Sequence, residues 1–190
     1  MGGKQAGGIF MRREFSAGGV VFKKIKGESS NLPAGEAGVK LLWLVAKSKP
    51  SKEYPDDVWR LPKGWLDDER GGKKPGQLAT GSKRASANQI IKAAIKEVAE
   101  EGGVEVKVIS KIATDNYFYT DKEKSKVAKF VTYFLMEWQR NLKEGFGEET
   151  EKVEWLEYKK ARERLTYPRE KNILEKANEI LGAGVQENLI

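Results

Sequence analysis

Short apolar runs separated by polar turns are the first pattern that the sequence shows. Each run has the length of a strand and is rich in β-branched and aromatic residues, which are enriched in sheets. A segment containing Ser, Asn, Pro and Gly at residues 27–38 separates the first two runs, so we expect these two to pair. The predicted strands are residues 16–22, 39–46, 58–61, 104–112, 116–120, 127–138 and 152–158.

Apolar residues at helical spacing predict three helices, at residues 87–101, 159–165 and 169–181. The glycine pair at 102–103 predicts the end of the first helix, because glycine adopts the left-handed conformation without penalty. Pro168 and Gly182 predict the start and the end of the last helix. Residues 65–86 are polar, glycine-rich and without an apolar period, which predicts a long loop.

Strands interleaved with a central helix and a C-terminal helix predict an α/β domain with a mixed sheet that is covered on both faces. The length of 190 residues is enough for one sizeable core. We expect a flexible N-terminus at residues 1–13, a domain at residues 14–182 with an inserted loop at about 66–86, and a C-terminal tail at residues 183–190.

The composition restricts the chemistry that the chain can perform, because it contains no histidine and no cysteine. This excludes a Ser-His-Asp relay, a Cys-His nucleophile, a zinc site with Cys and His ligands, and any disulfide. A metal site in this chain must use oxygen ligands, which favour magnesium or manganese over zinc or copper. We expect Mg²⁺, with Mn²⁺ as the second choice.

The formal net charge of +7 favours an anionic partner. Basic residues gather at residues 4–26, with six against the single acid Glu14, and at residues 70–92, with six and no acid. Acidic residues gather at residues 144–157. A basic rim beside acidic clusters suits a small, metal-bound, nucleotide-like anion better than a uniform nucleic-acid surface, although charge alone fits a merely soluble surface as well.

No segment of the sequence predicts a membrane span or a secretory signal. The longest apolar runs, residues 41–46 and 130–136, are far shorter than the roughly 20 residues that a spanning helix needs. Residues 1–8 are glycine-rich and have no apolar core. We therefore expect a cytoplasmic protein with no membrane partner, present as a monomer or a homodimer.

Three carboxylates on one stripe of the central helix are the most informative candidates for chemistry. At about 100° per residue, Glu97, Glu100 and Glu101 fall within roughly one third of the helix circumference. Like charges at this spacing cost about 0.2 to 0.5 kcal/mol per pair, and a divalent cation would reverse that sign. The alternative is a solvated, glutamate-rich turn that only faces water.

The stretch around these glutamates resembles the Nudix box, the pattern Gly-x5-Glu-x7-Arg-Glu-U-x-Glu-Glu-x-Gly-U in which U is aliphatic. The segments at 16–21 and 59–64 also resemble the family's first strand and its approach to the box. The matching positions are Gly64, Glu97, Val98, Glu100, Glu101, Gly103 and Val104. The resemblance extends from about residue 14 to residue 181.

Two positions depart from the family pattern. Lys96 stands where the family has Arg, which keeps the charge but loses the planar fork that makes bidentate pairs. The first Glu of the box is absent, and an insertion of 18 residues separates Arg70, six positions after Gly64, from Asn88, eight positions before Lys96. In the family this Glu and Arg form a structural brace, and we expect Asp67, Asp68 or Glu69 to replace or weaken it.

The resemblance implies an α/β/α sandwich with a mixed central sheet and a metal-dependent hydrolase activity. The expected reaction cleaves a pyrophosphate bond in a nucleoside diphosphate linked to another moiety, with a dinucleoside polyphosphate as one candidate. Some features are similar to the branch that hydrolyses dinucleoside polyphosphates and diphosphoinositol polyphosphates, including the sequence at residues 153–156. The implied metal ligands are Gly64, Glu97, Glu100 and Glu101.

The same resemblance leaves the general base and the substrate contacts open. Glu97 or Glu100 could take the proton from water, with Glu148, Glu149 and Glu151 of the acidic segment as rivals. Phosphate ligands are expected among Arg60, Lys63, Lys83 and Arg84, each of which has a solvated side chain as its alternative. Candidate aromatic contacts for a base are Tyr117, Phe118, Tyr119 and Tyr133, although an aromatic residue in a strand more often belongs to the core.

Three other interpretations remain open. A non-catalytic Nudix-fold module that binds nucleotide or RNA would explain the incomplete box. A P-loop is suggested by residues 76–83, but the final Lys and Ser order is reversed and no apolar strand precedes it. An RNA-binding protein would use the basic N-terminal and inserted segments, and its affinity would fall steeply with salt.

Overall fold

Strand β1 (Arg12–Gly27) is the centre of the fold and is buried on both faces. The computed structural model describes residues 11–27, 38–51, 57–69, 74–121 and 123–187. Along β1, Ala17 and Val21 face one side of the sheet while Val20 and Phe22 face the other. This alternation places apolar side chains on both faces, so the strand requires a layer on each side.

Seven strands of the described chain form one mixed sheet around β1. Its strand order is β3-β2-β1-β8-β7, with β4 paired to β1 and β9 paired to β2. β1 is parallel to β8 and antiparallel to β2 and β4, and the predicted pairing of the first two strands is confirmed. The other strands are β2 (Gly38–Ser48), β3 (Trp59–Arg60), β4 (Lys63–Trp65), β7 (Val104–Thr120), β8 (Lys126–Asn141) and β9 (Thr150–Leu156).

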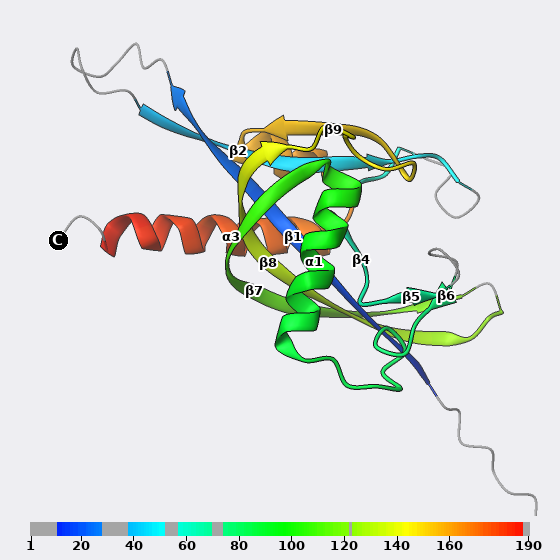
Figure 1. Ribbon diagram of the computed structural model, residues 1–190. Coiled ribbons are helices and arrows are strands. Elements are labelled where there is room, and N and C mark those ends of the chain that lie inside the picture. Colours follow the sequence, from blue (N-terminus) through cyan, green and yellow to red (C-terminus); the bar gives the residue numbers. More distant parts are fainter. Residues whose placement is uncertain (1–10, 28–37, 52–56, 70–73, 122, 188–190) are drawn as a thin grey trace, which may run out of the picture.

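Helices cover both faces of the sheet, which confirms the predicted α/β class. Helix α1 (Ala87–Gly102) lies across one face, and α3 (Pro168–Glu187) lies on the opposite face (Figure 1). Helix α2 (Tyr158–Arg164) packs with α3. None of the helices in these ranges is long and apolar enough to cross a bilayer.

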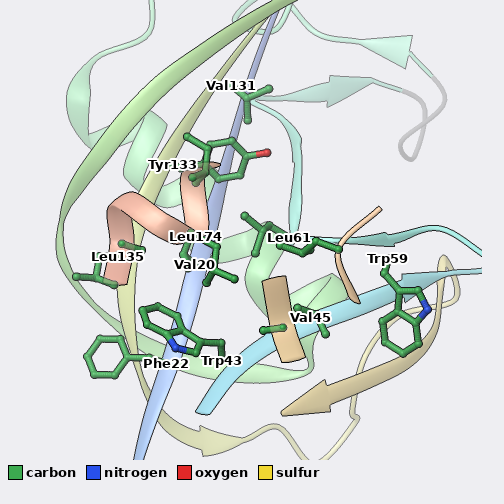
Figure 2. Packing of buried hydrophobic residues seen from close by; sticks show 14 residues of the cluster. Val20, Phe22, Trp43, Val45, Trp59, Leu61, Val131, Tyr133, Leu135 and Leu174 are labelled. Carbon is green, nitrogen blue, oxygen red and sulfur yellow. The ribbon is translucent and has the colours of Figure 1, made fainter. Parts of the chain in front are cut away.

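Two apolar clusters fill the space between the layers. The cluster under α3 contains Phe22, Trp43, Tyr133 and Leu174, which Figure 2 shows packed around the sheet. The cluster under α1 contains small residues of the helix beside larger side chains of the sheet. Its buried members are Ala17, Val21, Leu44, Ala93, Ala94, Val98, Val104, Phe134 and Met136.

Helix α1 begins and ends as predicted. Ser86 and Gln89 form a capping box, in which each side chain bonds the backbone amide of the other residue. Gly103 ends the helix with φ 66°, and its amide donates to the Ala99 carbonyl. A Cβ at Gly103 would also lie 2.8 Å from the Gly145 carbonyl carbon, so both conformation and space require glycine.

Three predictions about the elements need correction. The loop expected at 65–86 contains a two-stranded hairpin of β5 (Asp68–Glu69) and β6 (Lys74–Pro75). The two strands expected at 104–112 and 116–120 are one strand, because residues 113–115 pair with residues 131–133 of β8 and continue the ladder. Helix α3 continues through Gly182 to Glu187, since glycine in an exposed helix costs only about 1 kcal/mol. The turn expected at 27–38 lies almost wholly outside the described residues.

Candidate active site

Two carboxylates from opposite faces of the sheet bind the backbone that leads into β4. Glu101 of α1 accepts a hydrogen bond of 2.8 Å from the Lys63 amide through Oε2. Glu170 of α3 accepts one of 2.9 Å from the Leu61 amide through its own Oε2. Gly64, which follows Lys63 in β4, pairs with Ala17 of β1. The position of Gly64 is therefore fixed by both helices and by the central strand.

Glu97 lies directly against Gly64. A Cβ added at Gly64 would be 2.0 Å from Glu97 Oε2, so only glycine leaves room for this carboxylate. The Glu97 side chain is only 12% exposed. Burial, and then the negative charge of Glu101, raise the pKa of Glu97 to about 8. The structure thus crowds two helix carboxylates beside one glycine.

Glu100 is directed differently from its two neighbours. Its side chain is 54% exposed and its Oε2 lies 3.3 Å from Lys96 Nζ. Burial raises the pKa of Glu101, while Arg60 and Lys63 act in the opposite direction. Within the described ranges, no three acidic side chains converge as a preformed metal centre. The structure therefore brings Glu97 and Glu101 together, whereas Glu100 forms an ion pair with Lys96.

The donor atoms fit a hard cation. All of the candidate ligands are oxygens, which suit Mg²⁺ or Mn²⁺. Lys96 Nζ lies 3.9 Å from Glu97 Oε1, which is too long for a hydrogen bond. A cation beside Glu97 and Glu101 would relieve the repulsion that raises the pKa of Glu97. Glu100 would have to exchange Lys96 for the cation to join them.

The expected replacement for the family brace is confirmed at one position. Lys96 Nζ forms a hydrogen bond of 3.1 Å with Asp68 Oδ2, from the inserted segment. Asp67 instead accepts hydrogen bonds from the amides of Leu78 and Ala79, at 3.0 and 2.7 Å. These two amides belong to the stretch that resembled a P-loop. Because Asp67 already occupies them, they do not form a phosphate cradle.

The acidic segment brings one of the three rival bases toward the helix. Glu149 is exposed, and its charge acts on Glu97. Glu151, on β9, forms an ion pair of 3.0 Å with Lys47. Glu148 is exposed in the turn before β9. Of these candidates, Glu149 has the placement that suits a base.

The two basic residues next to the box have different surroundings. Lys63 is 5% exposed, and its Nζ lies 2.6 Å from Glu170 Oε1 in a buried ion pair. Burial and the charge of Arg60 lower the pKa of Lys63 to about 8, against the opposing effect of Glu170. Arg60 also acts on Glu101. Lys63 has the placement of a structural ion pair, whereas Arg60 remains a candidate for binding phosphate.

The other candidate contacts are spread over the molecule. Tyr133 is 2% exposed and lies inside the α3-side core, as Figure 2 shows, so its placement is that of a core residue. Tyr119 is partly buried and donates a hydrogen bond of 2.8 Å to Glu14 Oε2. Phe118 is 66% exposed on the same strand. Lys83 and Arg84 are exposed before α1.

A polar cluster around Glu14 was not predicted from the sequence. The Glu14 side chain is 3% exposed, although it carries a charge. Besides Tyr119, its carboxylate accepts hydrogen bonds from Arg12 Nη2 at 3.1 Å and Trp65 Nε1 at 3.3 Å. Lys129 Nζ lies 3.6 Å from Glu14 Oε2. One signal was present, since Glu14 is the single acid in a basic segment at residues 4–26.

Comparison with known proteins places this geometry in context. The sequence profile described as the NUDIX domain matches residues 34–177. No curated protein sequence matches the chain significantly.

Several solved structures share the fold. An Ap4A hydrolase from C. elegans, solved as a binary complex, is 20% identical, covers 90% of this chain and 98% of its own, and gives a TM-score of 0.53. A NUDIX hydrolase from Nitrosomonas europaea is 14% identical, with 88% and 90% covered and a TM-score of 0.54. The NUDIX domain of Shewanella oneidensis NrtR, complexed with ADP ribose, is 15% identical, with 90% of each chain covered and a TM-score of 0.51.

Proposed function

Because this chain belongs to the Nudix family of hydrolases, which act on phosphoric anhydrides, we propose that it is a metal-dependent pyrophosphohydrolase of nucleoside diphosphates linked to another moiety. Nudix hydrolases generally use divalent metals such as Mg²⁺. The observation that carries the proposal is the pair of crowded, partly buried carboxylates, Glu97 and Glu101, beside Gly64. Carboxylates crowded in this way repel one another, so binding a cation between them is favourable.

The proposed ligands are the carboxylates of Glu97, Glu100 and Glu101 with the backbone carbonyl of Gly64. When bound there, Mg²⁺ would neutralise charge on the phosphates and assist ionisation of the attacking water. Glu101 already receives the Lys63 amide, which orients its carboxylate. The exposed Glu100 completes the set once it leaves Lys96.

The protein's own groups supply the remaining requirements of the reaction. Water attacks one phosphorus, the bond to the bridging oxygen breaks, and that oxygen leaves with the electron pair on the second phosphate. We assign Glu149 as the general base that takes the proton from the attacking water, because it is exposed and its charge acts on Glu97. Glu97 and Glu100 are the other candidates for this role. Arg60 would bind a phosphate oxygen through its planar guanidinium.

Diadenosine tetraphosphate is the first substrate to assay. The net charge of +7 suits a polyanion, and the Ap4A hydrolase of C. elegans shares the fold. ADP-ribose, capped RNA and an oxidised nucleoside triphosphate complete a panel that covers different leaving groups. Product release should be measured with Mg²⁺, with Mn²⁺ and with EDTA. We expect turnover of at least one compound with a metal and none with EDTA.

The matched variants are Glu101→Gln and Glu105→Gln. Glu105 lies just beyond α1 in β7 and pairs with Arg140 at the surface, so it serves as the control. Glu101→Gln should lower kcat by about 100-fold or more, because it removes one metal ligand, while Glu105→Gln should leave kcat unchanged. Full activity of Glu101→Gln would refute the assignment. Nucleotide binding without turnover, unaltered in Glu100→Gln and Glu101→Gln, would favour the non-catalytic module.

A further inference from the structure

The buried Glu14 cluster lies beside the proposed active site and has no part in the mechanism described above. Glu14 and Lys129 are direct partners across the parallel strands β1 and β8. Trp65 follows Gly64 in β4, and its indole hydrogen bonds to Glu14. The cluster is therefore connected to the glycine that adjoins Glu97.

Lys129 does not form the short bonds of this cluster. Glu14 takes its hydrogen bonds from Tyr119, Trp65 and Arg12 at 2.8 to 3.3 Å. Lys129 Nζ lies 3.6 Å from the carboxylate, which is longer than a direct hydrogen bond, and 6.0 Å from the Trp65 ring centre. An ammonium has three N–H donors. The Glu14 carboxylate therefore balances the charge of Lys129 but does not accept a short hydrogen bond from its ammonium.

The position of Lys129 suits a group that meets a ligand. Its side chain keeps 19% exposure, unlike Glu14 at 3% and Lys63 at 5%. The charges of Glu97 and Arg60 both act on Lys129, so it belongs to the electrostatic surroundings of the metal site. A largely buried ammonium that lacks a short hydrogen bond to the described residues is stabilised by an anion that completes its shell.

We propose that Lys129 binds a phosphate of the substrate next to the metal site proposed at Glu97 and Glu101, and that Glu14 positions its ammonium. This inference rests on the proposed function and adds a residue to it. Lys129 contacts the substrate directly, whereas Glu14 acts through Lys129. The competing explanation is that Lys129 only neutralises a buried carboxylate.

The test uses the full chain and a non-hydrolysable, methylene-bridged analogue of diadenosine tetraphosphate. Binding is measured by calorimetry and by Trp fluorescence, with Mg²⁺ and with EDTA. Lys129→Met removes the ammonium at similar length, Lys129→Arg restores a cation, and Lys126→Met changes an exposed lysine on the same strand as the control. Circular dichroism and melting temperature show whether each variant folds.

We expect Lys129→Met to raise Kd by about 10-fold or more, the value of one charge-assisted hydrogen bond. Lys129→Arg should recover most of that loss if it folds, and Lys126→Met should bind as the wild type does. Glu14→Gln should raise KM more than it lowers kcat, because it misplaces the ammonium without touching the metal ligands. A Lys129→Met protein with wild-type Kd and KM would overturn the inference, as would a wild type that binds no analogue.

The outcomes separate this inference from the proposed function. Wild type that binds the analogue but hydrolyses nothing contradicts the proposed activity, and weaker binding by Lys129→Met would still support the phosphate contact. Wild type that hydrolyses substrate while Lys129→Met keeps its kcat and KM supports the activity and removes Lys129 from the site. If only the melting temperature of Lys129→Met falls, the lysine is structural and the inference is wrong.

Discussion

Replacing Gly64 by alanine tests the proposed site with the smallest change that the structure allows. The new Cβ would lie 2.0 Å from Glu97 Oε2, 2.3 Å from its Cδ and 2.6 Å from its Oε1. Ordinary contacts begin at 3.4 Å, so the carboxylate must move by more than 1 Å. Misplacement of about 1 Å at a reacting centre costs about 100-fold in rate. We expect kcat/KM to fall by about that factor and Mg²⁺ to bind more weakly.

The same substitution should affect stability far less. Overpacking costs about 1 to 3 kcal/mol in a rigid core, and here the atoms that must yield are the end of one side chain. In metal-free buffer, displacing Glu97 from Glu101 also relieves part of the charge repulsion. We therefore expect a loss of about 1 kcal/mol or less in urea unfolding.

Two other glycines provide matched controls for this experiment. Gly19→Ala would place a Cβ 2.5 Å from Val98 in the core, so it should reduce stability without displacing a carboxylate. Gly182→Ala meets nothing within 4 Å on α3 and should increase stability by about 1 kcal/mol. If Gly64→Ala keeps wild-type kcat/KM and Mg²⁺ affinity, Glu97 is not a ligand and the reasoning fails.

Three further predictions follow from the ion pairs and the buried carboxylate. Lys63→Met should lower the free energy of unfolding by about 3 kcal/mol in urea titrations, because it leaves Glu170 buried and unpaired; a loss below 1 kcal/mol would contradict the buried pair. Lys96→Met should cost less than about 1 kcal/mol in the same titration, because its contact with Asp68 is half exposed, and a larger loss would show that the brace is stronger than its exposure suggests. In EDTA, the free energy of unfolding should fall as pH rises from 4.5 to about 8, since burial and Glu101 raise the pKa of folded Glu97 and the native state holds its proton longer than the unfolded chain. Thermal melts should show a smaller fall in Glu97→Gln, and an equal fall in both proteins would disprove this origin.

The central helix could be predicted from sequence because its signals are local. The apolar stripe and the terminal glycines lie within one stretch, and α1 (Ala87–Gly102) matches the predicted range 87–101 to within one residue. The replacement of the brace by Asp68 could be anticipated for a related reason. Lys96 requires an acidic partner to form the brace, and the acids of the inserted segment lie together at residues 67–69, where Asp68 pairs with it.

The rest of the site depends on contacts that sequence spacing does not encode. Lys63 lies next to the box glycine, yet it pairs with a residue of α3 that no local pattern connects to it. Tyr119 and Tyr133 are both tyrosines in neighbouring strands, but one bonds to Glu14 and the other packs in the core. Strand register and helix placement decide these outcomes, and both are set by tertiary packing.

The hydrogen bond from Leu61 to Glu170 has a consequence for the order of events during protein synthesis. Glu170 follows Leu61 by 109 residues, so a growing polypeptide contains all of the proposed metal ligands well before it contains Glu170. Until α3 leaves the ribosome, the Leu61 amide lacks the Glu170 carboxylate that accepts its hydrogen bond in the folded protein. Hydrolytic competence should therefore arise only after α3 has been synthesised and has packed against the sheet.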